Sequence, residues 1–142
     1  MKPLLVKLVV VLIGLAIFGY AEVWGADWRI YAKPESGIGV YYYDADGITR
    51  PSKNIVRVWE KVVYSAKGVK RYVEESGKRY ENLSHSLNLW EFDCVEKKER
   101  ILQTTEYSKD GTVLSSTQSQ KTPWNFISPT SIGEALYEAV CK

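Results

Sequence analysis

The chain has 142 residues, 45% of them hydrophobic and 25% charged, a balance typical of one folded domain that excludes disorder along the whole length. Its 19 Lys and Arg residues nearly match its 17 Asp and Glu residues, so it lacks the basic excess of a nucleic-acid-binding protein. Two cysteines and one histidine are too few for a Cys/His zinc site, and we expect neither a metal nor a cofactor.

The first 21 residues have the pattern of a secretory signal peptide. Lys2 and Lys7 form a basic region before an uninterrupted apolar run over residues 8–18, which is shorter than the ~20 residues that span a bilayer. Small side chains at Gly19 and Ala21 predict cleavage after Ala21, with cleavage after Ala26 and an uncleaved anchor as alternatives. We therefore expect an exported mature domain, residues 22–142, with no membrane span and with 17 basic and 17 acidic residues, since the removed segment carries both lysines and no acid.

The strands expected in the first half are Trp28–Ala32, Val40–Asp44 and Ile55–Ser65, with Arg50–Ser52 in an irregular connection. The third of these strands has the clearest alternation of polar and apolar residues. Its even-numbered face is apolar except for Glu60, and we expect this face to pack in the core while the odd-numbered face is half-solvated. Such alternation favours an antiparallel sheet over a parallel one.

The second half of the chain adds a short helix, three strands and a C-terminal helix. Asp110-Gly111 lies between two alternating runs and is typical of a hairpin turn, and Ser131 with Glu134 matches a helix capping box. The expected elements are the helix Val69–Ser76, the loop Tyr80–Ser84, the strands Ser86–Cys94, Glu99–Ser108 and Thr112–Ser119, the loop Thr122–Pro129 and the helix Thr130–Cys141. The predicted fold class is α+β: a single antiparallel sheet of about six strands, a C-terminal helix packed on it and a short second helix.

Export places both cysteines, Cys94 and Cys141, in an oxidising compartment, where an isolated pair usually forms a bridge. A redox-active pair is the alternative, but the spacing is far from Cys-x-x-Cys. We predict a structural disulfide, with Cys141 brought to Cys94 by the C-terminal helix.

Several short segments occur in a fixed order along nearly the whole mature chain. The segments are Tyr41–Asp44, Ile48–Arg50, Val56–Trp59, Tyr80–Leu83, Asp93–Cys94, Ser128–Leu136 and Val140–Cys141. Their order resembles that of the bacterial surface-adhesin protein E-like domain family. The resemblance implies an exported bacterial domain with an antiparallel sheet, a packed helix and a disulfide, and the family's cysteines map onto Cys94 and Cys141.

The best-known members of that family bind host matrix and serum proteins such as laminin, plasminogen and vitronectin, and can form dimers. The resemblance therefore implies a protein partner and a possible homodimer. This chain departs from the founding type, which is a lipoprotein, because no acceptor cysteine lies near the predicted cleavage site.

Three carboxylates on predicted strands, Glu60, Glu91 and Glu106, are candidates for acid–base chemistry if they are buried as a pair. The alternative is a set of cross-strand pairs with Arg57, Lys61 or Arg100, or solvent exposure. His85, the single histidine, has no triad context and no ligand companions, so we expect it at the surface or at a strand edge. No catalytic site follows from these residues.

Aromatic residues make up 13% of the chain, and most of them belong in the core. Trp and Tyr are also favoured at protein interfaces. Since alternation within the Tyr41–Tyr43 run forces at least one ring away from the core, we consider Tyr41, Tyr43, Trp59 and Trp90 as a binding patch, with solvated rings on a sheet face as the alternative.

Two hypotheses for the function follow. The first is an exported, non-catalytic binding module that resembles surface-adhesin protein E and binds extracellular-matrix or serum proteins. The second is a periplasmic structural or interaction protein of the envelope, and a small hydrolase is a distant third.

Overall fold

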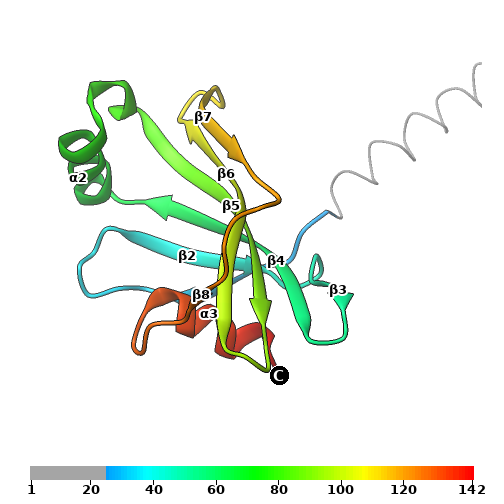
Figure 1. The fold of residues 1–142 in the computed structure, drawn as a ribbon. Coiled ribbons are helices and arrows are strands. Elements are labelled where there is room, and N and C mark those ends of the chain that lie inside the picture. The colour runs from blue at the N-terminus through cyan, green and yellow to red at the C-terminus, as the bar shows by residue number, and fades with distance from the viewer. Residues whose placement is uncertain (1–24) are drawn as a thin grey trace, which may run out of the picture.

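The structure is a computed structural model that describes residues 25–142 (Figure 1). The predicted signal peptide, residues 1–21, lies outside the described residues. Antiparallel strands form one sheet in the order β1-β2-β4-β5-β6-β7, with β3 paired to β4 and β8 paired to β6. The strands are β1 (Trp28–Ala32), β2 (Gly39–Asp44), β3 (Thr49–Ser52), β4 (Ile55–Tyr64), β5 (Leu83–Asp93), β6 (Lys98–Ser108), β7 (Val113–Gln118) and β8 (Asn125–Phe126).

Two α-helices accompany the sheet: α2 (Ala66–Ser76), which lies at the end of β4, and α3 (Ile132–Val140) (Figure 1). A short 3₁₀ turn, η1 (Lys78–Tyr80), follows α2. The single antiparallel sheet with two helices agrees with the predicted arrangement, although strands dominate and the fold is mainly β. The six strands on the main path of the sheet correspond to the six expected from the sequence.

Three expected irregular segments carry regular structure instead. Arg50–Ser52 belongs to β3, which pairs with β4 and tolerates Pro51 because its register shifts between Thr49 and Ser52. The loop expected over Thr122–Pro129 contains β8, whose two residues pair with Lys98 and Glu99 of β6. The loop expected over Tyr80–Ser84 is shorter, because η1 includes Tyr80 and β5 already begins at Leu83.

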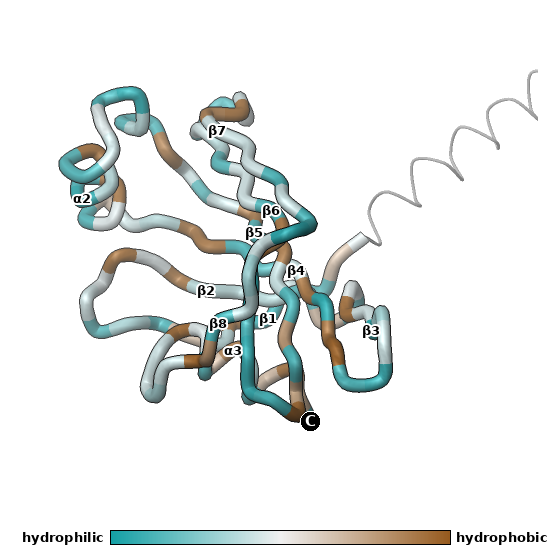
Figure 2. The backbone as a smooth tube through the Cα atoms, in the orientation of Figure 1, coloured by the Kyte–Doolittle hydropathy of each residue, from teal (hydrophilic) through white to brown (hydrophobic). Residues whose placement is uncertain are grey.

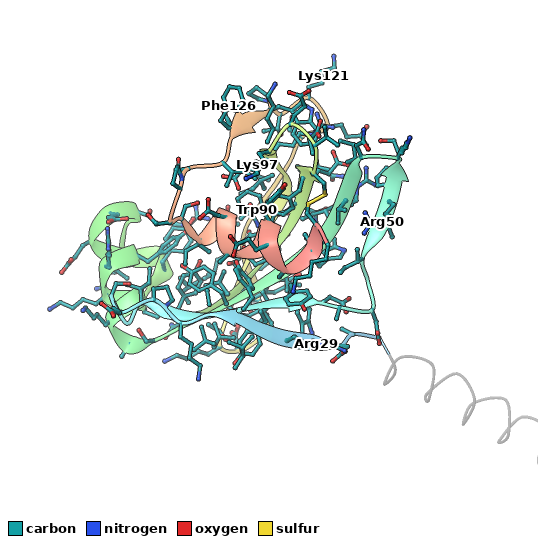
Figure 3. The ribbon with its side chains drawn as sticks, turned by 90° about the horizontal axis from the view of Figure 1, so that it is seen from below. Arg29, Arg50, Trp90, Lys97, Lys121 and Phe126 are labelled. Carbon is teal, nitrogen blue, oxygen red and sulfur yellow. A yellow bond between two sulfur atoms is a disulfide. The ribbon has the colours of Figure 1, made fainter. Side chains whose placement is uncertain are left out.

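The core lies between the sheet and α3. Val56 and Val58 on β4 and Phe92 on β5 are completely buried, and they contact Leu136 and Val140 of α3. This confirms the even-numbered face of β4 as the core face and the apolar stripe of α3 as its cover. Figure 2 shows hydrophobic residues interspersed with hydrophilic ones along β4, and Figure 3 shows α3 lying across the sheet beside Trp90.

The disulfide between Cys94 and Cys141 joins the end of β5 to the end of α3, with an S–S distance of 2.07 Å and 5.5 Å between the Cα atoms. This confirms the predicted bridge. The Tyr137 hydroxyl donates a 2.8 Å hydrogen bond to the Cys94 carbonyl oxygen beside it. The helix is therefore fixed to the sheet by a covalent bond, a hydrogen bond and its apolar stripe.

Side chains define the helix starts. Ser65 Oγ accepts a 3.0 Å bond from Gly68 N, so α2 begins at Ala66, three residues before the predicted start. Ser131 Oγ accepts a 3.1 Å bond from Glu134 N, as the capping-box pattern predicts. The Glu134 carboxylate accepts from Thr130 N rather than from the Ser131 backbone, so the second half of the box is displaced by one residue.

Candidate binding face

The sheet has two chemically different faces. The helix-covered face carries the even-numbered side chains of β4 and their cross-strand partners, and both α2 and α3 contact it. The open face carries the odd-numbered side chains of β4, paired as Trp59 with Leu89 and Lys61 with Leu87. Neither helix crosses the open face in the described part of the chain.

The four aromatic residues considered as one patch divide between these faces. Tyr41 and Tyr43 pair with Val62 and Glu60 on the helix-covered face. Trp90 packs against the core cluster on the same face. Trp59 lies on the open face, so the four rings do not form one surface.

Glu60 is the polar centre of the helix-covered face. Its side chain is almost fully buried and accepts hydrogen bonds from the Tyr31 hydroxyl, from Asn88 Nδ2 at 2.6 Å and from Trp90 Nε1 at 3.0 Å. Burial, followed by the Glu60 charge, raises the pKa of Tyr31, so this phenol remains a donor. Three neutral donors satisfy the carboxylate, which differs from the expected pairing with a cation and gives Glu60 a structural role.

Two more carboxylates lie on the helix-covered face. Glu106 is buried and accepts from the Tyr72 hydroxyl, while its Oε2 has no partner. Glu99 lies against the first turn of α3, where a Cβ on Gly133 would be 2.1 Å from its Oε2. Burial, followed by the charge of Glu60, raises the pKa of Glu99.

Within residues 25–142, no three His, Cys, Asp or Glu side chains are grouped so that they could hold a metal ion. In the same part of the chain, no helix is both long enough and apolar enough to cross a membrane.

Aromatic and aliphatic side chains gather at the centre of the open face. Lys61 Nζ lies 4.6 Å from the ring centroid of Trp28 and 5.4 Å from that of Tyr42. These cation–π contacts join both rings to the lysine on the same face of the sheet. The half-buried Trp59, Leu87 and Leu89 continue this surface across β4 and β5, and Ile30 and Val63 flank it with exposed fractions of 50% and 38%.

His85 also lies on the open face, half-buried and stacked on Tyr107 with 4.9 Å between the ring centroids. Burial, followed by the Lys61 charge, lowers its pKa. Ser84 Oγ lies 3.1 Å from the Nδ1 atom of this ring, so the histidine is held on the open face by a stacking contact and a hydrogen bond.

One end of the open face is polar and charged. The Glu91 carboxylate, only 3% exposed, receives Nε and Nη2 of Arg57 at its Oε2 and Nε and Nη2 of Arg100 at its Oε1, at 2.7–3.1 Å. Trp124 stacks on the Arg100 guanidinium, 4.3 Å from its ring centroid. This is the cross-strand pairing expected as the alternative to catalysis, and it neutralises Glu91.

Residues 28–142 match the family model described as surface-adhesin protein E. The chain belongs to this family. The adhesin E domain is also similar in structure to crystalline protein E from non-typeable Haemophilus influenzae, with a TM-score of 0.48 and 16% identity over 82% of this chain and 85% of that one. No curated protein matches the sequence.

Several residues of the open face were not foreseen as members of one surface. Alternation within β4 alone separates Trp59 from Val58 and Glu60, so this signal was available in the sequence. The registers that bring Trp28 and Tyr42 to Lys61, and Arg100 to Glu91, were not available, because cross-strand pairing is not encoded in local spacing. The adhesin E domain therefore presents a wider aromatic face than the sequence suggests.

Proposed function

We propose that this adhesin E domain is an exported, non-catalytic module that binds extracellular-matrix or serum proteins through the open face. One observation carries the proposal: the open face presents the half-buried rings of Trp59, Trp28 and Tyr42 beside leucines, with no helix of the described chain over them. Protein interfaces are rich in Trp and Tyr because these side chains contribute large contact areas at a small cost in conformational entropy. Membership of the adhesin family supports the same role.

The carboxylates support binding rather than catalysis. Glu91 is neutralised by two arginines, and Glu60 is saturated by three neutral donors. A general acid or base needs a carboxyl group that can reach a substrate, and both of these groups are buried.

The test is direct binding of the exported, purified chain to immobilised laminin, plasminogen and vitronectin at physiological salt. Trp59→Ala should weaken saturable binding at least about tenfold, as for a central aromatic interface residue. Val95→Ala is the matched control, since Val95 is 67% exposed at the β5–β6 turn, away from the open face. Circular dichroism verifies that both variants are folded.

Absence of binding to all three proteins would remove the matrix and serum role. An equal loss of binding affinity in Trp59→Ala and Val95→Ala would show that the open face is not the binding surface.

A periplasmic interaction protein of the envelope is the second candidate. It uses the same open face, either for an envelope protein or for a second copy of the chain. Protease treatment of intact cells distinguishes the locations, because only a surface-exposed domain is digested. Light scattering of the purified chain measures whether a homodimer forms.

A further inference from the structure

A cavity of about 380 Å³ lies at the charged end of the open face. Leu89 and Leu102 are its apolar lining residues, and the two guanidiniums of Arg57 and Arg100 flank buried Glu91. Three carboxamides complete the lining, those of Gln103, Gln118 and Gln120. The lining thus combines two leucines with convergent polar side chains that can orient a polar ligand group.

Glu91 fixes the orientation of both arginines, but it does not use all of their N–H donors. Each guanidinium has five N–H groups, and each uses its Nε and Nη2 atoms on Glu91. Arg100 Nη1 also lies 3.4 Å from the Thr122 carbonyl oxygen, while Nη1 of Arg57 is left for another acceptor. The side chain of Arg57 is 39% exposed and that of Arg100 is 23% exposed, so Arg57 has the more accessible guanidinium.

The net charge of the cavity indicates the charge of its ligand. Two guanidiniums and one carboxylate leave a single positive charge among residues whose other side chains are neutral. One carboxylate would neutralise this charge through the planar geometry that Arg prefers. A polysulfated glycan binds to a longer row of basic residues. The mature chain has equal numbers of acidic and basic residues, which does not favour such a row.

The position of the cavity indicates the form of the ligand. Gln118 ends β7, which is the last strand on the main path of the sheet. An extended segment can lie along such an edge, and carboxamides donate to and accept from peptide groups. Trp59 is adjacent, because it pairs with Leu89 and Leu89 pairs with Gln103.

We propose that this cavity, the Arg57–Arg100 pocket, binds one acidic side chain of an extended peptide segment in the partner protein. The inference rests on the proposed function, which supplies the protein partner, and it specifies the chemistry that the partner must carry.

The experiment is an NMR titration of the full chain, purified after export, with three probes. The first is the acetylated and amidated peptide Gly-Ser-Glu-Ser-Gly, the second is the same peptide with Gln in place of Glu, and the third is a heparin tetrasaccharide. The Arg Nε–H signals and the Gln carboxamide signals report the pocket. We expect the Glu peptide to shift the signals of Arg57, Arg100 and Gln118 with a Kd near 1 mM, about −4 kcal/mol, and the Gln peptide to leave them unchanged.

Arg57→Lys retains the charge beside Glu91 but loses the fork and should weaken the Glu peptide at least about fivefold. Arg29→Lys is the matched control, because Arg29 is exposed on β1, at the opposite end of the strand order from β7, and does not line the pocket. If Arg57→Lys does not fold, Gln118→Ala is the second variant, since it touches no buried charge pair, and it should weaken the peptide about twofold.

Three outcomes overturn the proposal: no shifts in the pocket up to about 10 mM Glu peptide, equal shifts with the Gln peptide, or tighter binding of heparin than of the Glu peptide at the same signals. These results are independent of the matrix-protein assay. Peptide binding without matrix binding retains the pocket and removes the matrix partners. Trp59-dependent matrix binding without peptide binding retains the open face and removes the pocket.

Discussion

Removal of the disulfide should destabilise the domain by an amount that its loop length sets. Cys94 and Cys141 are separated by 47 positions, and in the loop-entropy account a bridge of this span contributes about 4 kcal/mol at 25 °C. For a folded domain of this size, that corresponds to a fall of about 15 °C in Tm. The double variant Cys94→Ser/Cys141→Ser avoids a stray thiol and removes only the bridge.

Guanidinium unfolding at 25 °C and thermal unfolding, both followed by circular dichroism, measure the difference. The native chain without reductant should exceed the double variant by about 4 kcal/mol, and the gap should close when reductant is added. The double variant itself should be insensitive to reductant. A gap below about 1 kcal/mol without reductant would refute the reasoning, because the cross-link would then constrain an unfolded ensemble that is already compact.

Two further predictions concern single side chains. Gly68→Ala should destabilise the domain by about 1–3 kcal/mol, although Ala favours helices, because its Cβ would lie 1.9 Å from the Ile38 carbonyl oxygen. Lys67→Ala is the control, and a Tm of Gly68→Ala at or above that of the native chain would contradict this prediction. Glu99→Gln should raise Tm at pH 7 and have a smaller effect near pH 4. The pKa of Glu99 is higher in the folded state than in the unfolded chain, so the native protein loses stability as the pH rises from the unfolded-state pKa through the folded-state pKa. Glu138→Gln on the exposed side of α3 is the control, and a Tm gap that does not depend on pH would argue against a perturbed Glu99.

The features that the sequence predicted correctly depend on short-range patterns. Alternation identified the core face of β4, Asp110-Gly111 identified the β6–β7 turn, and Ser131 identified the start of α3. The pairing of Cys94 with Cys141 followed because only two cysteines are present. Each of these depends on residues within one element or on a count.

The features that the sequence missed depend on register. For Glu60 the sequence led us to expect a cross-strand cation or solvent, yet the sheet places Asn88 opposite it and Trp90 two positions further along β5. The bulge between Leu89 and Trp90 inserts Leu102 into β6 and helps to form the wall of the Arg57–Arg100 pocket. Short strands such as β3 and β8 carry too few residues for alternation to show.

The order of strands has a consequence for the folding of the domain. Successive strands on the main path of the sheet follow one another along the chain, apart from β3 between β2 and β4 and from α2 with η1 between β4 and β5. Most of the sheet can therefore grow by pairing of strands that are close in sequence. Helix α3 is the last element and docks on Val56 and Phe92, which are distant in sequence, so its contacts carry most of the loop-closure entropy. Until it docks, the most apolar face of the sheet remains open to water, so the core is complete only when the last residues of the chain are in place.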